Sequence, residues 1–173
     1  MAIDLASCIR DVPDFPKAGI LFKDITTLLK DSQAFHQAVD MLTDSFRDDK
    51  VDVVVGMESR GFIFGSVVAY NLGAGFVPVR KLGKLPADTL RVDYALEYGT
   101  NTLEIHKDAI AEGQRVLVMD DLLATGGTVA ATIELVRRLG GDVVGVGFLM
   151  ELLFLNGRRQ LGDDYKVVSL IKA

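Results

Sequence analysis

Two adjacent carboxylates and a glycine-rich turn lie close together in the chain. Asp120 and Asp121 follow the apolar run 116–119, and after two leucines the chain continues as Ala-Thr-Gly-Gly-Thr. Glycines relax the restriction that a Cβ imposes, so successive backbone N–H groups can turn inward around an anion, and threonine hydroxyls add donors. The run therefore predicts a cradle for one phosphate monoester, formed by Ala124, Thr125, Gly126, Gly127 and Thr128.

The acid pair needs a different ligand, because a carboxylate repels a phosphate. Asp120 and Asp121 suit the vicinal hydroxyls of a sugar, or a divalent cation held through water. A phosphorylated ribose would satisfy both the acids and the turn. The alternative is an ordinary strand–turn–helix with glycine at its turn. The Walker and dinucleotide-binding motifs fit less well, because the turn lacks a Gly-Lys-Ser/Thr end and no Gly-x-Gly-x-x-Gly follows a strand.

The elements around these residues predict an α/β fold. Residues 116–119 show no polar alternation, which is typical of a parallel strand covered on both faces, and a helix is expected over Val129–Leu139. Asp31 or Ser32 can cap a helix that runs to about Phe46. Further apolar strands are expected at 51–56, 75–79, 143–150 and 167–171, with another helix over 64–72. A short helix over 3–9, an irregular segment 11–19, a strand or lid at 20–25 and a hairpin of 94–99 with 102–106 complete the predicted elements.

Cations follow two of the predicted strands. Arg60 comes just after the strand 51–56, and ligands of open parallel sheets bind at the carboxyl ends of strands. Arg60 is therefore a candidate anion clamp, with a surface salt bridge as the alternative. Arg80, Lys81 and Lys84 follow the strand 75–79, and the polar stretch from there to position 93 predicts a mobile basic loop. An ordinary solvated hairpin is the alternative for that loop.

Composition limits the class of protein. The 173 residues suit one domain, 1–173, and the 49% apolar content with a mean hydropathy of +0.28 predicts a homodimer that covers surplus apolar surface. A net charge of −5, without a basic tail or a Lys/Arg cluster on a predicted helix, disfavours nucleic acid as a partner. Cys8 is the sole cysteine, no basic leader precedes an apolar core, and the longest apolar run, 143–150, is too short for a membrane span. Cytoplasm and no membrane partner are expected.

The run 116–128 resembles the phosphoribosyl pyrophosphate (PRPP) signature of the type I phosphoribosyltransferases, and the resemblance covers nearly the whole chain. It implies a central, mostly parallel sheet flanked by helices, with an N-terminal hood over about 1–30 and a flexible loop. The segment 15–24 is similar to the hood of those members that use adenine. By that match Phe22 lies against the purine face, while the backbone of Leu21 and Lys23 reads the base edge; without the match, Phe22 suits a core position.

The same resemblance implies roles for residues outside the signature. Glu97 would relay a proton at the imidazole side of the base, with Tyr98 as a cover of the site. Arg60 would reach the pyrophosphate, through a cis peptide near Glu58–Ser59. Lys81 and Lys84 would close over the pyrophosphate, with Arg80 reaching across a dimer. Where the family often has threonine, this chain has Leu153, which bears on a side contact near the base.

The implied reaction is transfer of the phosphoribosyl group of PRPP to adenine, which gives AMP and pyrophosphate. Mg²⁺ is the expected cofactor, held through substrate and water rather than directly by the protein. His36 and His106 are too few and too far apart in the sequence for a metal site. Two alternatives stay open: transfer to another base such as hypoxanthine, xanthine or orotate, and a non-catalytic PRPP-binding regulator.

Overall fold

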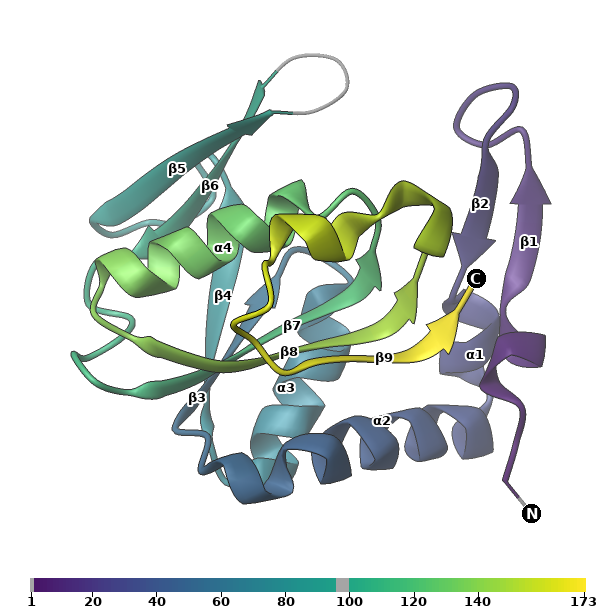
Figure 1. Ribbon diagram of the computed structural model, residues 1–173, viewed down its shortest axis with the longest axis horizontal. Coiled ribbons are helices and arrows are strands. Elements are labelled where there is room, and N and C mark those ends of the chain that lie inside the picture. Colours follow the sequence, from purple (N-terminus) through teal and green to yellow (C-terminus); the bar gives the residue numbers. More distant parts are fainter. Residues whose placement is uncertain (1, 96–99) are drawn as a thin grey trace. The chain divides into compact units, whose positions relative to one another are not determined.

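The computed structural model describes residues 2–95 and 100–173 (Figure 1). Glu97 and Tyr98, to which the sequence assigns the proton relay and the site cover, lie outside these residues. The chain divides into two compact units, one up to Met41 and one from Leu42 onward. The single domain expected from chain length remains a prediction.

The first unit contains a small antiparallel ribbon. Strands β1 (Arg10–Pro13) and β2 (Leu21–Asp24) pair with Val12 opposite Phe22. A 3-10 turn, Leu5–Cys8, replaces the longer helix predicted over 3–9, and β1 occupies part of the segment expected to be irregular. Helix α1 spans Thr26–Lys30, and α2 (Ser32–Phe46) begins as predicted. The Asp31 carboxylate accepts hydrogen bonds at 3.0 Å from the amides of residues 33 and 34 and so caps α2.

In the described part of the second unit, the strands form one seven-stranded sheet of order β5-β6-β4-β3-β7-β8-β9. Strands β3, β4, β7, β8 and β9 pair in parallel, while β6 runs antiparallel to β4 and β5. The bounds are β3 Val53–Met57, β4 Gly75–Lys81, β5 Thr89–Ala95, β6 Thr100–His106, β7 Arg115–Leu123, β8 Asp142–Glu151 and β9 Val167–Lys172. The mostly parallel sheet of the predicted fold class is confirmed.

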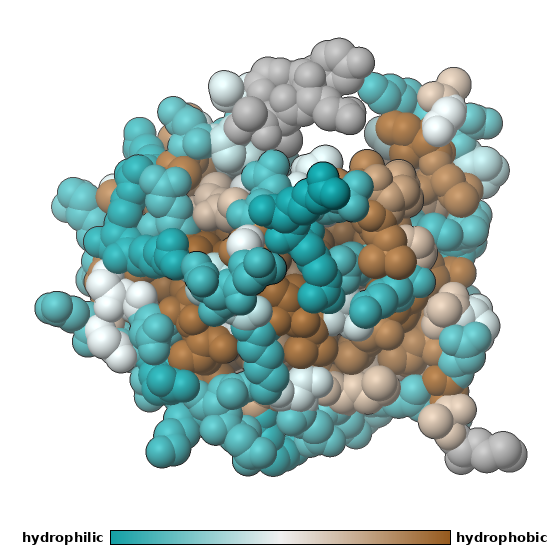
Figure 2. All heavy atoms as spheres, in the orientation of Figure 1, coloured by the Kyte–Doolittle hydropathy of each residue, from teal (hydrophilic) through white to brown (hydrophobic). Residues whose placement is uncertain are grey.

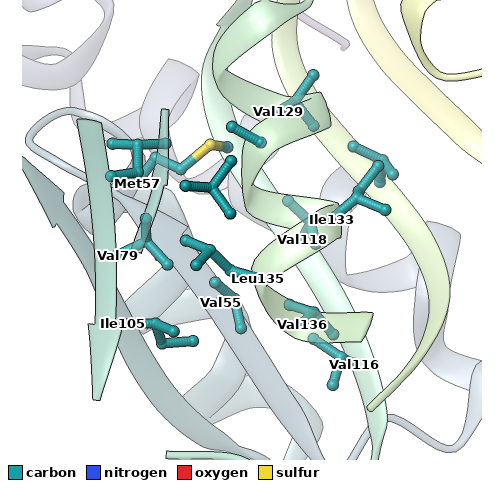
Figure 3. Close-up of a cluster of buried hydrophobic side chains, with 14 of the residues drawn as sticks. Val55, Met57, Val79, Ile105, Val116, Val118, Val129, Ile133, Leu135 and Val136 are labelled. Atoms are coloured by element: carbon teal, nitrogen blue, oxygen red, sulfur yellow. The ribbon is translucent and has the colours of Figure 1, made fainter. Parts of the chain in front are cut away.

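Helices cover both faces of this sheet, α3 (Gly61–Leu72) on one and α4 (Gly127–Arg138) on the other (Figure 1). Strand side chains alternate between the two faces, so the all-apolar strands supply two cores. Figure 3 shows the core under α4, where strand residues Val55 and Val118 meet Leu135 and Val136 of the helix. Two well-packed faces therefore hold the carboxyl ends of β3 and β7 next to the starts of α3 and α4.

Several strands extend further than predicted. Strand β7 continues to Leu123, because it still pairs with β8 beyond the point where β3 ends, so both aspartates belong to a strand. Strand β4 includes Arg80 and Lys81, since residues 80 and 81 pair with β6, and β5 begins at Thr89, which shortens the predicted basic loop to 82–88. Helix α4 begins two residues earlier than predicted, at Gly127.

Polar residues cover much of the visible surface, and apolar residues reach it between them (Figure 2). Within the described ranges, no helix combines the length and the apolar character that a membrane crossing requires.

Candidate active site

The predicted phosphate loop joins β7 to α4 and lines a pocket. Its walls are residue 120 and the continuous run 122–129. Gly126 caps the helix with a positive φ of 89°, which a residue with a Cβ adopts only under strain. The first turn of an α-helix has N–H groups without partners inside the helix, and the helix dipole is positive there. The pocket therefore presents donors and a partial positive charge to an anion.

A second segment supports this loop from behind. A Cβ on Gly126 would lie 2.4 Å from the carbonyl oxygen of Gly157, and a Cβ on Gly157 would lie 2.2 Å from that of Ala124. Gly157 opens the short 3-10 helix Gly157–Gln160. The two backbones approach so closely that both positions need glycine. Sequence reasoning missed Gly157, because no local pattern marks it.

The two aspartates are neighbours on β7 and differ in their partners. Asp120 lines the phosphate pocket, and its Oδ1 accepts a hydrogen bond at 2.9 Å from the Asp121 amide. The Asp121 carboxylate, almost fully buried, forms an ion pair with the Arg60 guanidinium, with Nε and Oδ2 2.8 Å apart. The structure therefore places Asp120 at the pocket of the predicted phosphate loop and pairs Asp121 with Arg60.

The start of α3 presses against Asp120. A Cβ on Gly61 would lie 2.8 Å from Asp120 Oδ1 and 3.0 Å from the Met119 carbonyl oxygen. Only glycine leaves space for the carboxylate at this contact. Gly61 is therefore a further position that the site requires, although the sequence indicated only Arg60 beside it.

Burial changes the titration of both aspartates. Loss of solvent raises the pKa of Asp120 well above its usual range, and the charge of neighbouring Asp121 raises it further. Burial also raises the pKa of Asp121, although Arg60 opposes this effect. Groups with a shifted pKa are common at functional sites, so both shifts support a binding site at this end of β7.

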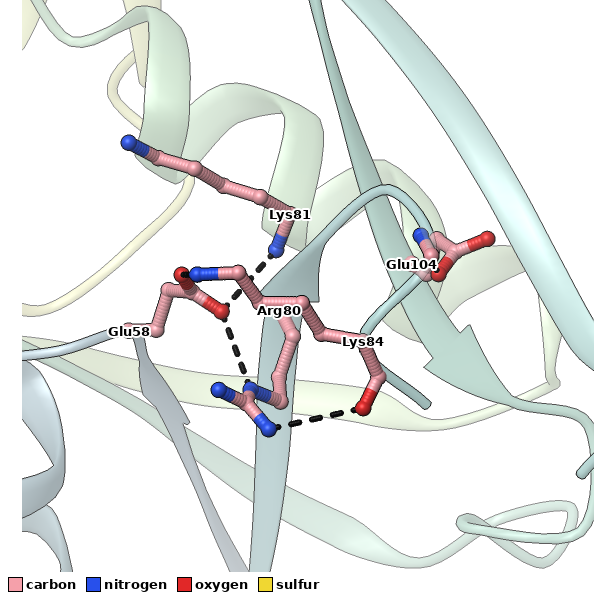
Figure 4. Close-up of polar contacts among 6 residues, drawn as sticks. Glu58, Arg80, Lys81, Lys84 and Glu104 are labelled. Carbon is pink, nitrogen blue, oxygen red and sulfur yellow. Dashed lines mark hydrogen bonds and ion pairs between the residues drawn. The ribbon is translucent and has the colours of Figure 1, made fainter. Parts of the chain in front are cut away.

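A third carboxylate, Glu58, gathers the predicted pyrophosphate cations (Figure 4). Glu58 Oε2 lies 2.9 Å from Arg80 Nε and accepts from the Lys81 amide at 3.2 Å, while Oε1 lies 2.5 Å from Lys84 Nζ. Burial alone would raise the pKa of Glu58, but the hydrogen bonds from Lys84, the Lys81 amide and Arg80 outweigh it and lower the pKa. Sequence reasoning assigned no role to Glu58, although it stands in the same segment as Arg60.

The remaining predicted residues divide between the two units. The peptide between Glu58 and Ser59 is cis, as the resemblance implied. In the first unit, the Phe22 ring packs edge-on against Phe15 with centroids 5.2 Å apart, and Lys23 pairs with Asp11 at 2.7 Å. Leu21 is half exposed. These contacts describe the ribbon that carries the predicted base-binding residues.

Comparisons with known proteins identify the family. The model of the phosphoribosyl transferase domain matches residues 26–172. The chain is 62% identical to the adenine phosphoribosyltransferase of Solibacter usitatus, over 98% of this chain and 97% of that one. It superposes with a TM-score of 0.95 on the crystal structure of the Thermoanaerobacter pseudethanolicus adenine phosphoribosyltransferase, at 56% identity and 98% coverage of both chains.

A yeast structure supplies a ligand-bound relative. The Saccharomyces cerevisiae adenine phosphoribosyltransferase, complexed with adenine and an imino-altritol bisphosphate, is 42% identical, with a TM-score of 0.90 and 96% coverage of both chains. Fold, signature and sequence identity agree over almost the full length. The chain therefore belongs to the phosphoribosyltransferase family and, within it, to the adenine phosphoribosyltransferases.

Proposed function

We propose that the protein transfers the phosphoribosyl group of PRPP to adenine, giving AMP and pyrophosphate, at the carboxyl ends of β3, β4 and β7. One observation carries this proposal: the phosphate pocket, the Asp120 carboxylate and the cation group around Glu58 all lie at the carboxyl ends of neighbouring strands of one sheet. Ligands of parallel sheets bind at that edge. A sugar with a phosphate at one end and a pyrophosphate at the other matches the order of these groups.

The phosphate loop holds the 5-phosphate of the substrate. The amides of 126–128 face it from the start of α4, with hydroxyls from Thr125 and Thr128, while Ala124 completes the turn. Asp120 borders the same pocket and accepts hydrogen bonds from ribose hydroxyls, with Asp121 behind it fixing Arg60. The loop fixes the sugar in place, so that the anomeric carbon keeps one orientation during the reaction.

Cleavage at the anomeric carbon separates charge. Positive charge develops on the ribose and negative charge on the departing pyrophosphate, so stabilisation is needed at both ends. The carboxylates of Asp120 and Asp121 favour the cationic ribose. Arg60, Lys81 and Lys84 take the departing anion, and Arg80 contributes from this subunit or from a partner. Closure of the loop 82–88 would keep water away from the reacting carbon.

Mg²⁺ fits the donors at this site. The carboxylates of Asp120 and Asp121 are oxygen donors, which suit a hard cation that keeps several waters. Within the residues that the structure describes, no group of three or more His, Cys, Asp or Glu side chains could hold a metal ion. We propose that Mg²⁺ binds chiefly through PRPP and water near Asp120 and Asp121. Bound there, it supplies positive charge to the leaving pyrophosphate.

The base binds at β2, the strand that carries Leu21, Phe22 and Lys23. Phe22 stacks on the purine, and the backbone of Leu21 and Lys23 pairs with its edge. Glu97 exchanges a proton with the imidazole ring as its nitrogen attacks, and Tyr98 covers the site. The adenine in the yeast relative's complex supports adenine as the base.

A base panel tests the substrate. Protein, PRPP and Mg²⁺ are incubated with adenine, hypoxanthine, xanthine or orotate, and nucleotides are separated by chromatography. AMP formation from adenine alone is the expected result. Preferential turnover of another base would replace adenine in the proposal. Tight PRPP binding without nucleotide from any base would favour a regulator.

A variant pair tests the phosphate loop. Thr125→Ala removes one exposed hydroxyl, so AMP affinity should fall about tenfold, the effect of losing one hydrogen bond to a charged group. Ser66→Ala removes an exposed hydroxyl on α3, whose present partner is the Phe62 carbonyl oxygen, and should leave AMP affinity unchanged. Calorimetry measures both. Equal AMP affinities for Thr125→Ala and the unmodified protein would show that the Thr125 hydroxyl does not bind the phosphate.

We further propose a cytoplasmic homodimer. The high mean hydropathy supports the dimer, as does the exposure of Ile63 and Tyr70, which lie two turns apart on α3. A single cysteine, Cys8, agrees with a reducing compartment. Light scattering after gel filtration gives the molar mass, and a monomer mass at micromolar concentration would reject the dimer.

A further inference from the structure

Glu104 is a deeply buried carboxylate that the proposed reaction does not use. It lies near the middle of β6 and is 1% exposed. In the sheet register it is opposite Arg80 of β4 on one side and Arg91 of β5 on the other. Buried carboxylates are rare without partners, because loss of hydration is costly. Its contacts therefore indicate why it is placed there.

The Glu104 carboxylate joins the two ends of the basic loop. Oε2 accepts a hydrogen bond from the Gly83 amide at 2.8 Å, at the start of the loop. Oε1 pairs with Arg91 Nε at 2.7 Å and accepts from the Thr89 hydroxyl at 3.3 Å, on the strand that follows the loop. The Glu104 side chain thus holds the segment 83–89 at both ends. Figure 4 shows Glu104 in the same view as Glu58 and Lys84.

Other bonds also hold the loop: the Ala87 amide donates to His106 Nε2 at 3.4 Å, Lys84 Nζ pairs with Glu58, and Arg80 Nη1 donates to the Lys84 carbonyl oxygen at 3.4 Å. Backbone bonds fix its two ends, from the Leu82 amide to the Thr102 carbonyl of β6 at 3.3 Å and from the Lys107 amide, just after β6, to the Asp88 carbonyl at 2.9 Å. Gly83 has a positive φ of 81° and open space around its Cβ position, so the turn itself imposes no packing. The bond from Glu104 to the Gly83 amide therefore fixes the chain one residue before Lys84.

We propose that Glu104 is a positioning residue for the basic loop, which places Lys84 for pyrophosphate while it makes no contact with substrate itself. The proposal rests on the proposed function of the loop. A glutamine could not replace the carboxylate, because its amide nitrogen only donates. That nitrogen would face either the Gly83 N–H or the Arg91 guanidinium, both of which are donors.

Glu104→Gln tests the proposal through two independent measurements. Hydrogen exchange followed by mass spectrometry should show amides 82–88 exchanging about tenfold faster, as expected for loss of one buried, charge-assisted bond. The KM for PRPP and the Kd for pyrophosphate should rise by a similar factor, about tenfold, while the Kd for AMP stays within about twofold. Glu134→Gln, which removes an exposed acid paired with Arg138 on α4, is the matched control and should change none of these values.

A second variant keeps the test decisive if Glu104→Gln does not fold. Arg91→Gln alters a side chain that is 60% exposed and leaves the Gly83 bond in place. Loop exchange and the KM for PRPP should rise in the same direction, by about threefold, because the exposed partner of a buried acid contributes less. Unchanged exchange in both variants, or in Arg91→Gln alone where Glu104→Gln does not fold, would overturn the proposal.

The remaining outcomes separate this inference from the function on which it rests. Lys84→Ala should raise the KM for PRPP; if it does not, the pyrophosphate role of the loop is wrong, whatever Glu104 does. Faster loop exchange without a change in KM would show an anchor that does not position Lys84 and would reject the proposal. A lower melting temperature with unchanged exchange and unchanged KM would give Glu104 a purely structural role.

Discussion

Two poorly exposed carboxylates near the site, Asp120 and Glu58, have pKa values shifted in opposite directions. Asp120 has another acid as its neighbour, so burial and repulsion both favour its neutral form. Glu58 has Arg80, Lys84 and a backbone amide, which together favour its charged form. The fold therefore bears the cost of one unfavourable charge beside the phosphate pocket. We expect a bound ligand that donates hydrogen bonds to Asp120 to offset this cost.

Asp120→Asn should stabilise the free protein at neutral pH. The pKa of Asp120 is raised above its ordinary value of 3.8, so the stability that its neutral form gives is present below pH 3.8 and is lost as pH rises through the raised pKa. The substitution removes the charge and should add about 1 kcal/mol, or roughly 3 °C in Tm, at pH 7. Below about pH 4 the two proteins should melt together.

Thermal melts from pH 3.5 to 8 measure this difference. Asp142→Asn, at an exposed acid 3.5 Å from Arg115, is the control and should leave Tm unchanged across the range. If Asp120→Asn melts at a lower temperature than the unmodified protein at pH 7, the ionised Asp120 carboxylate does not destabilise the fold.

Glu58→Gln should have the opposite sign. The pKa of Glu58 is lowered from 4.5, so its contribution to stability is present above that pH and is lost as pH falls through the lowered pKa. The variant should lose up to about 1 kcal/mol at pH 7, a value limited by the exposure of its two cationic partners. The same melts should show a smaller loss of Tm on acidification than in the unmodified protein, and an equal loss would exclude the ion pairs.

The phosphate loop depends on elements that are distant in sequence. It is formed by the end of β7 and the start of α4, but Gly157 closes it from behind and Gly61 of α3 borders its aspartate. Each approach is too close for a Cβ. The shape of the pocket therefore depends on three segments, and a change in any of them should displace the pocket.

Gly126→Ala tests this arrangement against Gly73→Ala. Both glycines have positive φ, 89° and 67°, but only at Gly126 would a Cβ collide, 2.4 Å from the Gly157 carbonyl oxygen. Gly73→Ala, at the end of α3, should cost about 1 kcal/mol of strain and leave AMP binding unchanged. Gly126→Ala should cost about 2–3 kcal/mol, as strain and overpacking combine, and weaken AMP binding more than about tenfold.

Denaturant unfolding and calorimetry give the two quantities for each variant. Normal AMP affinity in Gly126→Ala would show that the loop can shift without losing its ligand. The comparison with Gly73 removes the general effect of a Cβ at positive φ.

The second unit obtains its stability from two cores on the faces of one sheet. The core under α4 joins side chains from β3, β4, β6, β7 and β8 to the helix that starts at the phosphate loop (Figure 3). Because that helix and β7 carry the loop between them, packing far from the ligand fixes the pocket. A closely packed core transmits a local displacement, so a change in this core should also reach the pocket.

Leu135→Ala should lower the free energy of unfolding by about 3 kcal/mol, the usual cost of a cavity at a fully buried leucine. Leu153→Ala, at a half-exposed leucine, should change it by less than about 0.5 kcal/mol. Urea titration with a common slope measures both. Similar losses for the two variants would contradict the role of the α4 core.

Local chemistry was sufficient to predict most of the elements and the phosphate loop. Unbroken apolar runs identified β3, β7 and β8, because a strand covered on both faces shows no alternation, and Asp31 marked the start of α2 by its capping side chain. Adjacent acids and glycines indicated a sugar phosphate from their chemistry alone. These features depend on residues that are neighbours in the chain, so periodicity and motif spacing contain them.

Long-range pairing set the features that local patterns missed. Strand β7 runs on through Asp120 and Asp121 because β8 continues beside it, and this places both acids on a strand rather than in the loop. Glu58, Glu104 and Gly157 take their roles from partners 13 to 33 residues away, which no local pattern specifies. A sequence determines which groups can bind an anion, but the register between strands determines which of them meet, because hydrogen bonds between distant segments set that register.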